Sequence, residues 1–184
     1  MPPEDVRPEP VPAAGTDAAA RPRVRALLWW LAAAIVAADQ ITKVLVQQLI
    51  PLFGSVTVVP GLLDLVHIHN AGVAFGFMND LEHPLRSAFT TLLALAALAA
   101  IAYYARQVQP EERLARTGLS LVLGGAIGNL IDRVRLGYVV DFIDAYRGDW
   151  HFWAFNVADA AISCGAVLIF AELFLAGRHA SHPR

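Results

Sequence analysis

Residues 87–105 read SAFTTLLALAALAAIAYYA, a run without a single charged side chain. An α-helix rises about 1.5 Å per residue, so about 20 apolar residues are needed to cross the roughly 30 Å of hydrocarbon in a bilayer. The run is long enough and apolar enough to be a transmembrane helix. It decides the class of fold, because a helix of this length in a soluble protein would carry a charged face.

The composition of the whole chain agrees with a membrane protein. Of its 184 residues, 57% are hydrophobic and only 16% are charged, whereas a soluble domain usually has about 25% charged residues. The net charge of -2 and the sequence pI near 6.3 exclude the concentrated basic face of a nucleic-acid-binding protein.

Three further apolar segments have the length of a span: residues 26–48, interrupted by Asp39 and Lys43, residues 114–131 and residues 156–176. With residues 87–105 they predict an all-α membrane protein with four transmembrane helices. The Gly-xxx-Gly spacing within residues 124–128 favours close helix packing in the third span. Cys164 has no partner for an internal disulfide, and its apolar surroundings favour a buried structural thiol.

Basic residues predict the orientation of these spans, because they are enriched on the cytoplasmic side of a membrane. They are Arg21, Arg23 and Arg25 before the first span, Arg106, Arg113 and Arg116 between the second and third, and Arg178 and Arg184 after the fourth. Both termini are then cytoplasmic, and residues 49–86 and 132–155 form outer loops. The bias is moderate, since five basic residues fall on the outer side.

The first outer loop is too long for a simple connection. Its β-branched residues 56–59, the turn signal Pro60–Gly61 and the apolar residues 62–68 are typical of two strands joined by a turn. We expect a small extracytoplasmic β-sheet element there, resting on the outer membrane surface.

The ends of the chain differ from its centre. Residues 1–24 are rich in Pro and Ala and predict a disordered tail. Residues 25–177 form the expected membrane domain, and residues 178–184 a short cytoplasmic tail. The arginines before the first span also suit a cleaved secretory signal, but the three later spans and the long preceding tail favour a retained helix.

Ionisable residues lie where a membrane protein should avoid them. A central Asp or Lys costs about 3 kcal/mol on insertion scales, whereas a Leu returns only about 0.5 kcal/mol. In the predicted topology six such residues, from four separate stretches, lie near the outer ends of the spans or just beyond: Asp39, Lys43, Asp132, Arg133, Asp141 and Asp159. Their convergence at one depth predicts a functional site.

Helical spacing leaves two interpretations open for some of these residues. Asp39 and Lys43 are four positions apart, and Asp132 and Arg133 are adjacent, so each pair suits either an ion pair that locks the helices or a functional site. Asp141 and Asp159 have no basic residue within four positions, which favours the functional site.

Several chemistries are excluded by the sequence. It has no nucleophile-elbow sequence, no serine placed near Lys43 for a Ser-Lys dyad and no His-Glu-x-x-His helix. His67 and His69 share one face of a predicted strand, but two histidines without a third ligand favour polar surface residues over a metal site. Two facing aspartates suit an aspartic hydrolase, in which one carboxyl keeps a proton and the other activates water without a cofactor.

Two other classes of membrane protein were weighed. A small proton-coupled transporter also uses acids in a helix bundle, but it favours acids near the midplane, and here they gather at one surface. A purely structural membrane subunit is the other class, and it predicts that Asp141→Asn has no effect.

Five ordered blocks resemble a known family. They are DQITK at 39–43, NAGVAF at 70–75, GGAIGNLIDR at 124–133, VVDF at 139–142 and FNVAD at 155–159. In order and layout they resemble bacterial lipoprotein signal peptidase, also called signal peptidase II or prolipoprotein signal peptidase. The chain departs from the family at Ala160, where a serine is frequent, and in its long N-terminal tail.

The resemblance implies specific roles. The catalytic pair would be Asp141 and Asp159, with no metal or other cofactor. Polar residues that contact substrate or support the site map onto Asn70, Asn129, Asp132, Arg133 and Asn156, while Asp39 and Lys43 take a structural or orienting role. The substrate would be a prolipoprotein whose signal peptide is cut off just before a diacylglyceryl-modified cysteine. The implied setting is the bacterial inner membrane, with membrane lipid as a further partner and a monomer expected.

Overall fold

The computed structural model describes residues 22–72, 83–109 and 111–180, so residues 1–21 of the expected tail lie outside the described residues. The elements are α1 (Pro22–Leu49), β1 (Ser55–Val59), β2 (Leu63–Asn70), α2 (His83–Ala105), α3 (Arg113–Leu136), β3 (Val139–Arg147), β4 (Trp150–His151) and α4 (Val157–Ala180). Among the described residues, four helices are long and apolar enough to cross a membrane. The predicted number of spans is confirmed.

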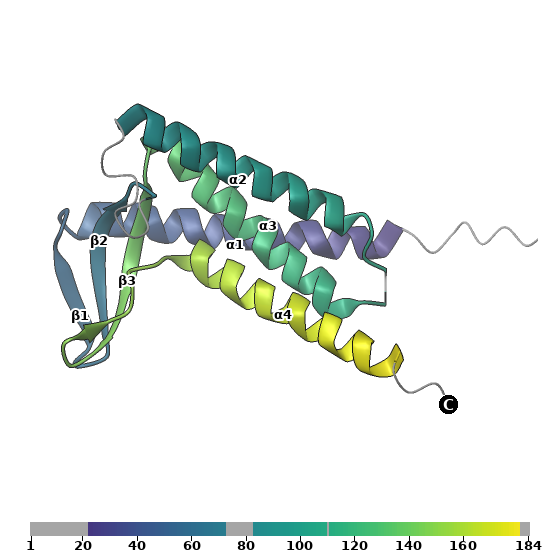
Figure 1. The fold of residues 1–184 in the computed structure, drawn as a ribbon. Helices are drawn as coiled ribbons and strands as arrows, with labels where there is room; N and C mark the ends of the chain where they lie inside the picture. Colours follow the sequence, from purple (N-terminus) through teal and green to yellow (C-terminus); the bar gives the residue numbers. More distant parts are fainter. Residues whose placement is uncertain (1–21, 73–82, 110, 181–184) are drawn as a thin grey trace, which may run out of the picture.

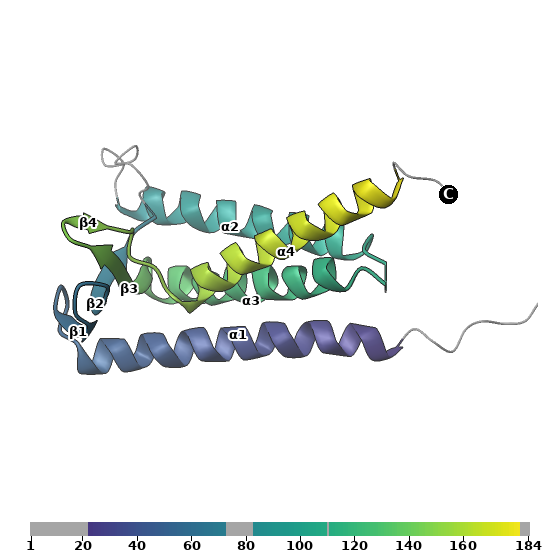
Figure 2. The same cartoon turned by 90° about the horizontal axis from the view of Figure 1, so that it is seen from below.

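The helices run side by side, and the strands gather at one end of the bundle (Figure 1). α1 begins and α4 ends at the opposite end (Figures 1 and 2). α3 is the central helix, because it packs against α1, α2 and α4. It continues to Leu136 and ends at Gly137 in the left-handed conformation. Asp132 and Arg133, expected at or beyond the end of the third span, therefore lie inside the helix.

Both long loops contribute to one antiparallel sheet of order β1-β2-β3-β4. The β1–β2 hairpin confirms the strands predicted in the first loop. β3 and β4 from the second loop were not predicted, since the acidic residues in VVDFIDAYR obscure the alternation of a strand. In the β2–β3 pairing Ile68 lies opposite Asp141. The buried side chains of Val46, Ile50 and Phe142 form the core where the sheet meets α1.

Small residues bring α3 close to its neighbours, as the Gly-xxx-Gly spacing predicted. A Cβ atom added to Gly124 would lie 2.8 Å from the carbonyl oxygen of Ala32 on α1. One added to Gly118 would lie 2.5 Å from the carbonyl oxygen of Gly165 on α4. No side chain fits in either place, so these glycines set the spacing of the helices.

Two features of α4 add to this picture. Cys164 is exposed, so the prediction of a buried thiol was wrong: apolar neighbours in the sequence do not place a residue inside a bundle whose outer face is itself apolar. Glu172 accepts hydrogen bonds from the backbone N–H groups of Leu114 (2.9 Å) and Ala115 (3.3 Å). Its carboxylate caps the first turn of α3. These hydrogen bonds connect α3 and α4 at the end away from the sheet.

Candidate active site

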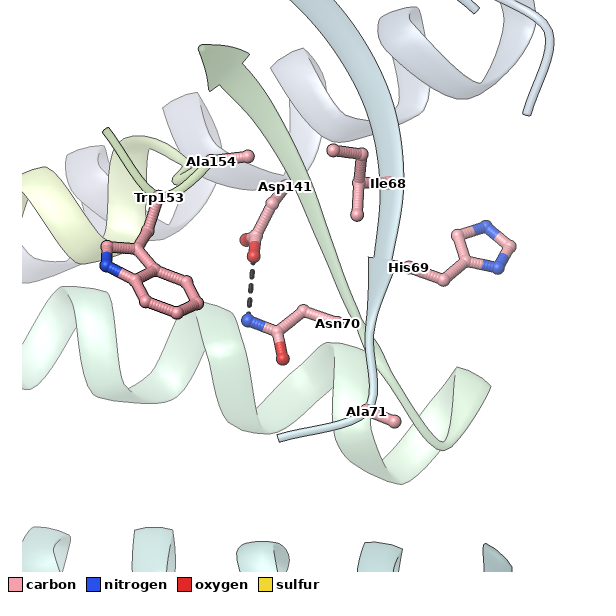
Figure 3. A pocket seen from close by; sticks show the side chains of 7 residues that line it. All are labelled: Ile68, His69, Asn70, Ala71, Asp141, Trp153 and Ala154. Atoms are coloured by element: carbon pink, nitrogen blue, oxygen red, sulfur yellow. Dashed lines mark hydrogen bonds between the residues drawn. The ribbon is translucent and has the colours of Figure 1, made fainter. Parts of the chain in front are cut away.

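Asp141 lies on β3 between two asparagines. The Asn70 amide donates to its Oδ2 at 2.8 Å, and the Asn156 amide donates to its Oδ1 at 2.7 Å. Figure 3 shows Asn70 reaching from β2 to this carboxylate. The residue is only 2% exposed. Each carboxylate oxygen thus has an amide donor, and neither of these donors carries a charge.

Asp159 lies in the first turn of α4. The Asn129 side chain on α3 donates to its Oδ1 at 2.8 Å. The Asn156 side-chain oxygen accepts from the Asp159 N–H at 2.9 Å, and the Asn156 N–H donates back to Asp159 Oδ2 at 3.3 Å. This reciprocal pair is a capping box, so Asp159 helps to start the helix that carries it.

Asn156 joins the two aspartates into one network. Its buried amide contacts Asp141 Oδ1 and also lies 3.2 Å from Asn129 Oδ1, while Asn129 holds Asp159. Residues from β3, α3 and the start of α4 meet there. The structure therefore brings together the aspartates of the VVDF and FNVAD blocks with three of the predicted polar residues.

The electrostatic setting of Asp141 favours a bound proton. Burial raises the pKa of Asp141 from its ordinary 3.8 to about 6, and the negative charge of Asp159 acts in the same direction. The amides of Asn70 and Asn156 and the charge of Lys43 oppose this rise. At a pH below about 6 the protonated form of Asp141 predominates.

Lys43 is the centre of a buried ionic cluster behind the aspartates. Its ammonium lies 2.8 Å from Asp39 Oδ2, 2.9 Å from Asp132 Oδ2 and 3.0 Å from Asn129 Oδ1. The residue is only 2% exposed, and its three N–H donors match three acceptors. Because Asn129 Oδ1 faces the ammonium, its Nδ2 is turned toward Asp159. Lys43 therefore orients a residue that holds one of the aspartates.

The ion pairs in this cluster show which of the pairings suggested by the sequence are formed. Asp39 and Lys43 do pair. Asp132 pairs with Lys43 instead of the adjacent Arg133, whose guanidinium donates to the Asn129 carbonyl oxygen at 3.2 Å. The charge of Arg133 interacts most strongly with Asp159.

The same carboxylates also fasten backbone groups. Asp39 Oδ1 accepts from the Ala158 N–H at 2.9 Å, and Asp132 Oδ2 accepts from the Val140 N–H at 3.1 Å. Gly128 leaves the space for Asp39, since an added Cβ atom would lie 2.6 Å from Asp39 Oδ2.

Gln40 was missed as a site residue, although it lies inside the DQITK block. Its amide donates to Asp39 Oδ2 at 3.2 Å, to Asp132 Oδ1 at 3.0 Å and to the Gly128 carbonyl oxygen at 3.2 Å. Its position next to Asp39 was the available signal.

A cavity of about 410 Å³ opens beside Asp141. Its lining consists of Ile68, His69, Asn70, Ala71, Asp141, Trp153 and Ala154 (Figure 3). Trp153 and Ala154 follow β4 and had no sequence signal, because no motif includes them. The cavity therefore reaches one of the two aspartates.

One of the two histidines of β2 contradicts the prediction that both are polar surface residues. They share one face of a strand, but His67 is only 6% exposed, so its description as a polar surface residue was wrong. Its Nδ1 lies 2.9 Å from the Ile50 carbonyl oxygen. Among the described residues, no group of three or more His, Cys, Asp or Glu side chains could hold a metal ion.

Comparison with known proteins gives a consistent result. Residues 31–175 match the family model of signal peptidase (SPase) II. A lipoprotein signal peptidase of Geobacter metallireducens is 45% identical over 135 residues, which cover 73% of this chain and 82% of that protein. One of Solibacter usitatus is 42% identical over 164 residues, covering 88% and 98%. A bacterial membrane enzyme solved by the in meso method at 1.9 Å resolution is 31% identical with a TM-score of 0.71, covering 80% of this chain and 92% of that one.

Proposed function

The chain belongs to the signal peptidase II family, and on this basis we propose that Asp141 and Asp159 are the catalytic pair with which it removes signal peptides from prolipoproteins. It is a multi-pass membrane peptidase. The proton-coupled transporter considered from the sequence gains no support from its relatives.

One observation carries the assignment of the pair. The Asn156 side chain donates to Asp141 and accepts from the backbone of Asp159, so a single residue holds both acids in register. Asp39 and Asp132 are also buried acids, but each forms an ion pair with Lys43. The carboxylates of Asp141 and Asp159 are instead held by neutral amides, and Asp141 lines a cavity.

The environments of Asp141 and Asp159 indicate different protonation states for the two acids. Asp141 is buried with its pKa raised to about 6, which suits the acid that holds the proton. Asp159 lies in the first turn of α4, where the helix dipole stabilises negative charge, and it interacts with the charge of Arg133. We therefore assign the proton to Asp141 and the negative charge to Asp159.

The reaction follows from this division. Asp159 takes a proton from a water molecule while the water oxygen attacks the scissile carbonyl carbon. Asp141 donates its proton to the carbonyl oxygen, which gives a neutral tetrahedral intermediate. When the C–N bond breaks, the new amine takes the proton from Asp159 and the second hydroxyl returns a proton to Asp141. Both acids end in their starting states.

Burial separates substrate-binding residues from supporting ones. Asn129, Asp132 and Asn156 are at most 6% exposed and use their polar atoms within the network, so they support the pair. Asn70 is exposed at the edge of the cavity, and Arg133 is partly exposed. Their exposure supports a role in binding the substrate backbone, which Asn70 combines with holding Asp141.

The predicted topology completes the proposal. The sheet and the pair lie at the outer membrane surface, both termini are cytoplasmic, and the membrane domain spans residues 25–177. The depth suits a prolipoprotein cut just before a diacylglyceryl-modified cysteine, whose lipid chains stay in the bilayer. Lipid is then the natural surrounding of the protein, which works as a monomer.

A gel-shift cleavage assay on a diacylglyceryl-modified prolipoprotein tests the catalytic pair. Wild type should cleave, and Asp141→Asn and Asp159→Asn should each be inactive while keeping the melting temperature of the wild type within a few degrees. Asp144→Asn is the matched control on the same strand and should cleave normally. Near-normal turnover by either dyad variant would remove that residue from the pair.

Labelling with a membrane-impermeant maleimide tests the topology. In a Cys164→Ala background, Asp149→Cys near the sheet should be labelled from outside the inner membrane, and Gln109→Cys between α2 and α3 should not. The reverse pattern would invert the proposed orientation.

A further inference from the structure

The geometry points to a binding site for a zinc-class divalent cation formed by His67 and His69, on the face of β2 turned away from the catalytic aspartates. Their Nε2 atoms lie 3.2 Å apart. In Figure 3 the ring of His69 points away from Asn70 and Asp141. His69 also belongs to the lining of the cavity beside Asp141, but its ring points to the other face of the strand, so the inference goes beyond peptide cleavage.

The spacing of the two nitrogens suits a shared metal ion. Zinc binds imidazole nitrogen at about 2.0–2.1 Å. Two nitrogens 3.2 Å apart, each about 2.05 Å from the ion, subtend about 100° at it, close to the tetrahedral angle. The same separation also allows a hydrogen bond between the two rings, so a bound ion would replace that contact.

Each ring is held in place by its own support. The Ile50 carbonyl oxygen accepts from Nδ1 of His67 at 2.9 Å, so Nδ1 carries the hydrogen and the Nε2 of neutral His67 presents a lone pair. The ring of His69 stacks on Tyr138, with centroids 3.8 Å apart and planes inclined by 18°. A carbonyl bound to the far nitrogen of a histidine is the usual way in which proteins orient a metal ligand.

To bind the ion, His69 has to present the lone pair of its Nε2, so its proton moves from Nε2 to Nδ1 through solvent.

The rest of the coordination sphere is open. No further His, Cys, Asp or Glu in the described part of the chain completes a group of three, so water fills the remaining positions on the partly exposed side of His69. Such a site binds a metal reversibly and does not take part in the cleavage chemistry.

Titration calorimetry with Zn²⁺ alone, on the tag-free, chelator-treated full chain in detergent, tests the proposal. Wild type should bind one ion per chain, and His69→Gln should weaken binding by about tenfold or more, since loss of a ligand costs at least as much as loss of a supporting residue. His151→Gln is the matched control and should bind as wild type does. Its ring pairs with Asp144 at 2.9 Å elsewhere on the sheet.

Two outcomes would overturn the site. Loss of binding in His151→Gln with His69→Gln unaffected would place the ion at Asp144, and absence of saturable binding would leave His67 and His69 as a hydrogen-bonded pair only. If His69→Gln fails to fold, a spectroscopic measurement on the wild-type protein still tests the site. With one equivalent of Cu²⁺, electron paramagnetic resonance should count two imidazole nitrogens, and a spectrum without them would refute the site.

Discussion

Asn156 offers the sharpest test of how the pair is tuned, because serine at this position separates two of its functions. Asn156 caps α4 by accepting from the Asp159 N–H, and its amide donates to Asp141. Serine is also a good N-cap residue, but its single hydroxyl cannot also reach Asp141. Asn156→Ser should therefore keep the helix cap and lose the amide donor.

The size of the effect follows from the lost bond. A hydrogen bond to a charged group contributes about 1.5–3 kcal/mol, and one pKa unit corresponds to about 1.36 kcal/mol. The Asn156 amide lowers the pKa of Asp141, so its removal should raise that pKa by about 1–2 units. The starting value is about 6. Asp141 then keeps its proton to a pH of about 7–8.

The assay is the pH dependence of kcat/KM for the lipidated prolipoprotein, which reports the free enzyme. In wild type kcat/KM should fall about tenfold per pH unit above about 6, as Asp141 loses its proton. In Asn156→Ser this limb should move up by about 1–2 units. Asn156→Ala should show the same shift and also lose about 1 kcal/mol of stability with the cap. An unmoved limb in both variants would refute the assignment of the proton to Asp141.

Three further predictions concern the support of the site. Lys43→Met should destabilise the protein by about 3–5 kcal/mol, because it leaves Asp39 and Asp132 buried without a cation; thermal unfolding in detergent measures this, and a loss below about 1 kcal/mol would contradict the buried cluster. Gly128→Ala should cost about 1–3 kcal/mol by crowding Asp39, whereas Ala37→Gly on the exposed face of α1 should cost about 1 kcal/mol or less. EDTA should leave the cleavage rate unchanged, and a loss of activity restored by zinc would assign the reaction to a metal.

Much of the fold could be predicted from the sequence because bilayer physics leaves few choices. The uncharged run at 87–105 and the spacing of the other apolar segments were enough for four helices. β3 was not predictable in this way, because the acidic Asp141 and Asp144 interrupt its pattern and its partner β2 lies some 70 residues away. Such pairing depends on long-range contacts that no local window contains.

For the candidate site, the sequence predicted that the acidic residues lie at one depth in the membrane. It did not predict which basic residue each of them pairs with. An ion pair between Lys43 and Asp39, four residues away, was one of two interpretations left open, and the structure has this pair. The second partner of Lys43, Asp132, comes from α3 and was expected to suit Arg133. Which carboxylate a lysine meets depends on helix rotation and on the space left by Gly128, and neither is visible in spacing along one chain.

The capping box of α4 has a consequence for how this protein changes over generations. Asp159 both starts the helix and belongs to the proposed catalytic pair, so folding alone disfavours any replacement that cannot accept a hydrogen bond from the Asn156 backbone. A lineage that no longer needed cleavage would still retain a carboxylate or an amide there. Asp141 starts no helix, so its replacement would leave the first turn of α4 intact. An aspartate retained at position 159 is therefore weaker evidence of selection for activity than an aspartate retained at position 141.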